Sequence, residues 1–145
     1  MIVLEIPGRP KVTLEHLVLD VNGTIALDEQ LVSGVTERVH DLRKMFEIHL
    51  LTADTHGRQR HIDQALDVTG FRLTPGKDEA KQKARYVNDL GANLVVAIGN
   101  GANDALMLEP AAIGIVVLRS EGTSADALRT PISSRQAPSS PSTWY

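Results

Sequence analysis

The chain has 145 residues, enough for one domain with its own core, and 42% of them are apolar but only 3% aromatic. A net charge of −3 and a pI near 5.9 argue against a nucleic-acid-binding protein, and the absence of cysteine excludes disulfides and thiolate metal sites. No apolar run reaches the ~18 residues of a membrane span and the N-terminus has no basic signal region, so we expect a cytoplasmic protein.

The chain begins with three expected strands. Residues 2–6 and 11–15 have the pattern of a β-hairpin, and the apolar run Leu17-Val18-Leu19 predicts a buried strand that ends at Asp20. Beyond this point, segments with helical spacing of apolar residues alternate with short, continuous apolar runs. The expected helices cover residues 33–45 (with Ser33 as N-cap), 57–68, 78–90, 103–110 and 124–129, and the later strands cover 47–52, 94–98 and 113–118.

Alternating helices and apolar strands predict βαβ units around a parallel sheet that is covered on both faces. The expected fold class is therefore α/β, a three-layer α/β/α sandwich of Rossmann-like type. Residues 1–129 would form this domain, and residues 130–145, rich in Ser and Pro, would form a flexible tail. Ligands of such sheets bind at the carboxyl ends of the strands, so we expect Asp20, Thr52 and Asn100 to share one rim.

The stretch Asp20-Val21-Asn22-Gly23-Thr24 carries the strongest functional signal. It places a carboxylate at the end of a buried strand and then turns at a glycine, where positive φ is accessible. A carboxylate beside exposed backbone N–H groups suits nucleophilic attack on a phosphoryl group. Three further features follow in order: Thr52 after an apolar strand, a lysine in Lys81-Gln82-Lys83, and the loop Gly99–Asp104. Together they supply the parts of phosphoryl transfer, namely a nucleophile, groups that hold phosphoryl oxygens, and an acidic Mg²⁺ site.

With these four motifs in this order, residues 14–118 resemble the haloacid-dehalogenase-like (HAD-like) superfamily, and in particular the soluble phosphorylation domain of P-type ATPases. The resemblance implies a phosphohydrolase or phosphotransferase in which Asp20 forms an aspartyl-phosphate. It further implies that Thr52 and a lysine bind the phosphoryl group with help from Gly23, Thr24 and Ala53. The implied Mg²⁺ ligands are Asp20, Asn22, Asn100 and Asp104.

Either Lys81 or Lys83 could be the lysine that binds the phosphoryl group. Counting back from Gly99 with the ATPase spacing selects Lys81, whereas matching the helix through Tyr86, Val87 and Leu90 selects Lys83. The short connection Gly91-Ala92-Asn93 before the next strand favours Lys83.

The chain departs from the family at two positions. Asn22 stands where family phosphatases have an aspartate that protonates the leaving group and activates water, help that is worth ~10²–10⁴ in rate. Asn100 stands where the family often has another aspartate, which removes one charge from the implied Mg²⁺ site. The sequence thus predicts slow turnover, and it leaves open a catalytically weak binding or regulatory module with the same fold.

The gaps between the motifs are too short for a cap domain, so we expect a capless member that acts on a phosphorylated small molecule or macromolecule, with possible help from a second subunit. We expect no membrane or nucleic-acid partner. The five histidines, at positions 16, 40, 49, 56 and 61, show no metal-ligand spacing.

Overall fold

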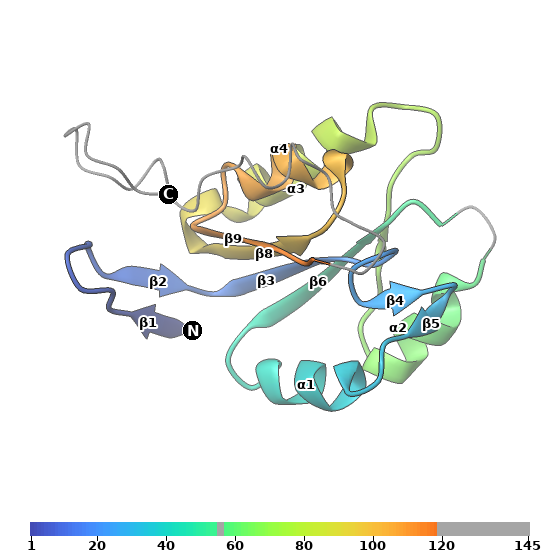
Figure 1. Cartoon of the computed structure of the whole chain (residues 1–145), viewed down its shortest axis with the longest axis horizontal. Coiled ribbons are helices and arrows are strands. Elements are labelled where there is room, and N and C mark those ends of the chain that lie inside the picture. Colours follow the sequence, from blue (N-terminus) through green and yellow to red (C-terminus); the bar gives the residue numbers. More distant parts are fainter. Residues whose placement is uncertain (55–56, 119–145) are drawn as a thin grey trace.

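The computed structural model describes residues 1–54 and 57–118 of the chain. Its centre is a five-stranded parallel sheet with the strand order β7-β6-β3-β8-β9 (Figure 1). These strands are β3 (His16–Asp20), β6 (Glu47–Thr52), β7 (Phe71–Arg72), β8 (Val95–Gly99) and β9 (Ile113–Val116). The central strand β3 therefore lies between β6 and β8, whose carboxyl ends flank its own.

Alternate residues of the central strands pack into two separate cores because side chains in a strand point to opposite faces. Leu17 and Leu19 of β3 belong to one core, while Val18 between them belongs to the other. Strand β8 follows the same rule, with Val96 on the first face and Val95 on the second. Burial on both faces explains why these strands are continuously apolar.

Two pairs of helices cover the two faces, which confirms the three-layer α/β/α prediction (Figure 1). Helices α1 (Val35–Leu42) and α2 (Gln59–Leu66) pack on the first core, and α3 (Glu79–Leu90) and α4 (Ala105–Leu108) pack on the second. Short 3₁₀ turns η1 (Ala92–Leu94) and η2 (Ala102–Asp104) precede β8 and α4. The expected N-cap Ser33 is wrong: α1 begins after Gly34, whose φ of 85° is left-handed backbone.

Two hairpins flank the sheet. Strands β1 (Ile2–Leu4) and β2 (Val12–Leu14) pair antiparallel as predicted, and β2 leads directly into β3. Strands β4 (Ala26–Leu27) and β5 (Gln30–Leu31) form a second hairpin, which the sequence did not predict, just after the Asp20 motif. The expected helix at 124–129 and the tail at 130–145 lie outside the described residues. Among the described helices, none has both the length and the apolar character that crossing a bilayer requires.

Candidate functional site

The candidate site lies where three neighbouring strands end. Asp20 is the last residue of β3, Thr52 is the last residue of β6, and Gly99 ends β8 just before Asn100. Because β6, β3 and β8 are adjacent and parallel, the three ends meet at one rim of the sheet.

A buried three-residue bridge joins this rim to α3. The Lys83 Nζ atom lies 2.6 Å from Asp20 Oδ1 and 2.7 Å from Asp104 Oδ1, so one ammonium donates to both carboxylates. Thr24 Oγ1 donates to the other oxygen of Asp20, Oδ2, at 2.9 Å. All four side chains are buried. Both oxygens of Asp20 are thus fixed in position by partners from different elements.

The structure shows which of the two candidate lysines contacts Asp20. The Lys83 side chain is 7% exposed and takes part in the bridge, whereas that of Lys81 is 76% exposed and pairs with Asp78 at the start of α3. Only Lys83 of this pair therefore contacts Asp20.

The loop after β8 is built around Asp104. Its Oδ2 atom accepts hydrogen bonds from the backbone N–H groups of Asn100 and Gly101, both at 2.9 Å. Its Oδ1 atom is left to face Lys83. A Cβ atom on Gly99 would lie 2.5 Å from Asp104 Cγ, so only glycine lets this carboxylate pack against the end of β8.

The loop after β3 is a tight turn. The Val21 carbonyl accepts from the N–H groups of Thr24, Ile25 and Ala26, and Gly23 adopts a φ of 81° and donates to the Ala26 carbonyl. The backbone N–H groups of Gly23 and Thr24 are thus bonded within the turn. These two residues shape the site and, through the Thr24 hydroxyl, orient Asp20.

The bridge perturbs the protonation of its members. Burial raises the pKa of Asp20 to about 6, Lys83 opposes this shift, and the nearby charge of Asp104 adds to it. For Lys83, burial alone would lower the pKa, but the two carboxylates outweigh it, so the pKa is raised and the ammonium stays charged. A buried carboxylate with a raised pKa at a strand end is a feature of functional sites.

A cleft with a volume of about 280 Å³ opens onto the bridge. Besides the three bridge residues, Glu79 of α3, Asn22 and Ala53 line it, and so do Asn100 and the residues that follow it. Thr52 is 1% exposed at the end of β6, and its Oγ1 atom accepts a hydrogen bond from the Asp54 N–H group at 3.1 Å. The cleft therefore brings together most of the residues that the sequence singled out, but Thr52 is buried at the end of β6 and does not line it.

The oxygen donors of this cleft fit a hard cation such as Mg²⁺, which prefers carboxylate and amide oxygens. Asp20 and Asp104 bring two carboxylates to one ammonium, so one negative charge is in excess when all three are ionised. Asn22 and Asn100 add amide oxygens along the same wall. These four residues are the ones that the sequence predicted as Mg²⁺ ligands, and that assignment stays a prediction.

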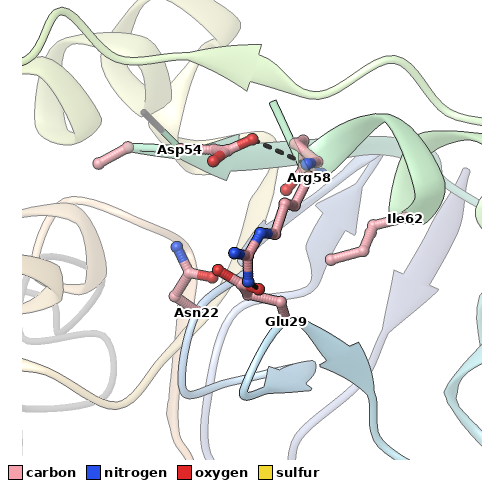
Figure 2. A pocket seen from close by; sticks show the side chains of 7 residues that line it. Asn22, Glu29, Asp54, Arg58 and Ile62 are labelled. Atoms are coloured by element: carbon pink, nitrogen blue, oxygen red, sulfur yellow. Dashed lines mark hydrogen bonds and ion pairs between the residues drawn. The ribbon is translucent and has the colours of Figure 1, made fainter. Parts of the chain in front are cut away.

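A second cleft, of about 220 Å³, adjoins the first and shares Asn22 and Ala53 with it. Figure 2 shows Arg58 reaching across it from the start of α2 to Glu29 in the β4–β5 hairpin, with which it forms an ion pair. Neither residue was predicted from the sequence. Glu29 sits in a hairpin turn without glycine, and Arg58 precedes a helix at a position where charged residues are common, so neither carried a signal.

One sequence relative matches a short part of the chain. It is the uncharacterized protein MJ0072 of Methanocaldococcus jannaschii, which is 49% identical over 39 residues, or 27% of this chain and 89% of that protein. No family model matches the chain.

Solved structures match most of the chain at low identity. A putative HAD family hydrolase from Streptomyces avermitilis matches 79% of this chain and 72% of its own, with a TM-score of 0.60 and 16% identity. The 3-deoxy-D-manno-octulosonate 8-phosphate phosphatase of Moraxella catarrhalis, in complex with magnesium and phosphate ions, matches 81% of this chain and 74% of its own (TM-score 0.61, 15% identity). A zinc-transporting PIB-type ATPase matches over 70% of this chain, but only 16% of that protein (TM-score 0.58, 25% identity).

These likenesses confirm the HAD-like fold, which the chain shares with a phosphatase and with part of a PIB-type ATPase. Over residues 1–54 and 57–118 no cap domain interrupts this core, since only the β4–β5 hairpin and α1 separate Thr24 from Thr52.

Proposed function

We propose that the chain is a Mg²⁺-dependent phosphohydrolase or phosphotransferase in which Asp20 is the nucleophile and turnover is slow. The observation that carries this proposal is the buried Asp20–Lys83–Asp104 bridge at the carboxyl end of the central strand. It supplies a fixed carboxylate, a permanent cation and a second carboxylate beside one cleft. The HAD-like fold, which known phosphatases share, supports the same conclusion.

In the first step, one Asp20 oxygen attacks phosphorus, a new O–P bond forms and the bond to the leaving oxygen breaks. Thr24 and Lys83 hold the carboxylate in place before attack. Lys83 then stabilises the negative charge of the phosphoryl oxygens. Ala53, which follows the buried Thr52 at the end of β6, lines the cleft beside them. Mg²⁺, held by Asp20, Asn22, Asn100 and Asp104, would supply further charge neutralisation when bound.

In the second step, water attacks the aspartyl-phosphate and restores the carboxylate. Asn22 lines the cleft where an acid–base residue would act, but its amide neither donates a proton to the leaving group nor accepts one from water. Water must therefore supply and take up these protons, which is why we expect slow turnover. Asn22→Asp should raise turnover by about 10²–10⁴-fold if this group is limiting.

The second cleft gives room for the group that carries the phosphoryl. It joins the first cleft at Asn22 and Ala53, and its far wall carries Glu29 and Arg58 (Figure 2). Part of the wall is apolar, at Ile62. We infer a small or extended polar substrate whose leaving group lies between the β4–β5 hairpin and α2.

The decisive experiment is mass spectrometry of the intact chain after incubation with acetyl phosphate and Mg²⁺. We expect one phosphoryl adduct that maps to Asp20, is lost in Asp20→Asn, and persists in the matched surface variant Asp41→Asn. A panel of phosphomonoesters then tests turnover with the same variants. Phosphatase activity that Asp20→Asn retains would refute the mechanism.

The second candidate function, a binding or regulatory module, is favoured by the two carboxamides at Asn22 and Asn100, which both line the cleft. It predicts saturable binding of inorganic phosphate without an adduct on Asp20. The same mass spectrometry experiment distinguishes the two, because only the enzyme becomes phosphorylated.

A further inference from the structure

A second cluster of ligand-type side chains lies at the opposite end of the sheet from Asp20. His16 begins β3 and pairs in register with Glu47, which begins β6. His49 follows Glu47 by two residues and so points to the same face. One ligand atom from each of the three residues lies within 4.8 Å of the other two.

The three side chains converge on one point. The His16 Nδ1 atom lies 3.1 Å from His49 Nε2 and 3.4 Å from a carboxylate oxygen of Glu47, and His49 Nε2 lies 4.0 Å from the other oxygen. A tetrahedral Zn²⁺ ion with bonds of about 2.0–2.1 Å spaces its ligand atoms roughly 3.3 Å apart. The observed separations are close to this value, so small side-chain movements suffice to place all three around one ion.

A second layer holds one of the imidazoles in place. The His49 Nδ1 atom, on the far side of the ring from the cluster, lies 3.0 Å from the Tyr86 hydroxyl on α3. Metal-bound histidines usually donate their other ring N–H to a carboxylate, carbonyl or water oxygen. The Tyr86 hydroxyl can accept from His49 Nδ1 in the same way, and that tautomer leaves a lone pair on Nε2. His49 and His16 are nearly buried, at 9% and 15% side-chain exposure, while Glu47 is 69% exposed. The cluster thus has two nearly buried imidazoles and one exposed carboxylate on its solvent-facing side.

We propose that His16, Glu47 and His49 form a binding site for a divalent transition-metal ion of the Zn²⁺ class, with water at the fourth position. Two imidazole nitrogens and one carboxylate suit Zn²⁺, Co²⁺ or Ni²⁺ and disfavour Mg²⁺, which takes oxygen ligands. The ion would join the first residues of β3 and β6. This site is independent of the proposed phosphoryl chemistry: Asp20 lies four positions after His16 along β3, a distance of about 13 Å.

The test is isothermal titration of the full, tag-free chain with Zn²⁺ in excess Mg²⁺, which saturates oxygen-ligand sites. We expect one Zn²⁺ ion per chain. His16→Gln and His49→Gln should each weaken binding at least tenfold, and Glu47→Gln, at an exposed position that leaves the fold intact, should also weaken it. His40→Gln and His61→Gln, on the exposed faces of α1 and α2, are matched controls that should bind as the wild type does.

Two further variants define where the ion binds. Tyr86→Phe keeps the ring but removes the hydroxyl, and should weaken binding about tenfold while circular dichroism stays unchanged. Asp20→Asn should leave the Zn²⁺ affinity unchanged whether or not it abolishes phosphorylation. The proposal is overturned if no saturable Zn²⁺ binding occurs, if His16→Gln and Glu47→Gln bind as tightly as the wild type, or if Asp20→Asn rather than His16→Gln removes the binding.

Discussion

Replacing Asp20 by asparagine should stabilise the protein at neutral pH, although the same change should abolish phosphorylation. Burial raises the pKa of Asp20 from 3.8 to about 6, against the opposing effect of Lys83, so the folded chain prefers the protonated carboxyl. At 1.36 kcal/mol per pKa unit, holding the ionised form in the folded state costs about 3 kcal/mol above pH 6. Asparagine resembles the protonated form: it carries no charge and gives up the bond from Lys83, which keeps Asp104, while its oxygen still accepts from the Thr24 hydroxyl. It therefore avoids this cost.

The direction of this pH dependence follows from the linkage between protonation of Asp20 and folding. The contribution of Asp20 to stability is fully present below the unfolded pKa near 3.8 and is lost as the pH rises through about 6. The stability difference between Asp20→Asn and the wild type should therefore grow from near zero at about pH 3.5 to about 3 kcal/mol at pH 7.

Urea denaturation followed by circular dichroism, with chelator and at constant ionic strength, measures this difference. Asp41→Asn is the control, because a hydrogen bond from Lys44 lowers the pKa of that exposed carboxyl, and its removal should give a small effect of opposite sign. A pH-independent difference, or an Asp20→Asn variant that is less stable than the wild type at pH 7, would refute the reasoning.

Three further predictions concern the surroundings of Asp20. Lys83→Met should lower the free energy of unfolding by about 3–5 kcal/mol because it leaves buried carboxylates without their cation, whereas Lys81→Met should change it by less than about 0.5 kcal/mol. Equal effects in urea denaturation would contradict the placement of the lysines. Gly99→Ala should destabilise by about 1–3 kcal/mol and reduce phosphorylation, because its Cβ would lie 2.5 Å from the neighbouring site carboxylate. Gly101→Ala, where the nearest such atom is 3.7 Å away, is the matched control, and a Gly99→Ala variant as stable and as active as Gly101→Ala would argue against this packing. Asn100→Asp should tighten Mg²⁺ binding about tenfold in calorimetry, since it adds a carboxylate to the wall of the cleft; an unchanged dissociation constant would count against the proposed Mg²⁺ site.

The sequence predicted the sheet and its two layers of helices because the signals for them are local. The strands at 16–20, 47–52 and 95–99 are short apolar runs, and α3 begins at Asp78, whose side chain accepts from the Lys81 N–H group as an N-cap should. The sequence also favoured Lys83, and the structure brings its ammonium to Asp20. That contact depends on how α3 packs against β3. The order of the motifs suggested that a lysine of this helix would reach Asp20, but their spacing alone did not decide between Lys81 and Lys83.

The β4–β5 hairpin escaped prediction because its turn lacks the usual residues. Leu27 pairs with Gln30 around Asp28 and Glu29, which both have positive φ, at 46° and 66°. Such turns normally contain asparagine or glycine, and a pair of acidic residues gives no hairpin signal. The hairpin forms nevertheless, next to the turn that Gly23 closes.

The cluster of His16, Glu47 and His49 was not predicted from the sequence for a different reason. Metal-ligand spacings are recognisable within one segment of a sequence, but His16 and His49 are 33 residues apart. They meet only because β3 and β6 are neighbours in a register that places His16 opposite Glu47. Contacts between strands depend on this register, which a single sequence does not reveal.

Under the proposed function, the two carboxamides affect different steps, and this difference can be measured. With acetyl phosphate, whose acetate leaving group needs no proton, formation of the aspartyl-phosphate needs only Asp20 and Lys83, which are both present. Its hydrolysis needs a proton acceptor that Asn22 does not supply. The chain should therefore accumulate as a phospho-enzyme during turnover. Asn22→Asp should lower the phosphorylated fraction at every Mg²⁺ concentration because it speeds hydrolysis. Asn100→Asp acts through Mg²⁺ affinity, so its effect should disappear when Mg²⁺ is saturating. If both variants change the phosphorylated fraction equally at saturating Mg²⁺, the two amides do not have these separate roles.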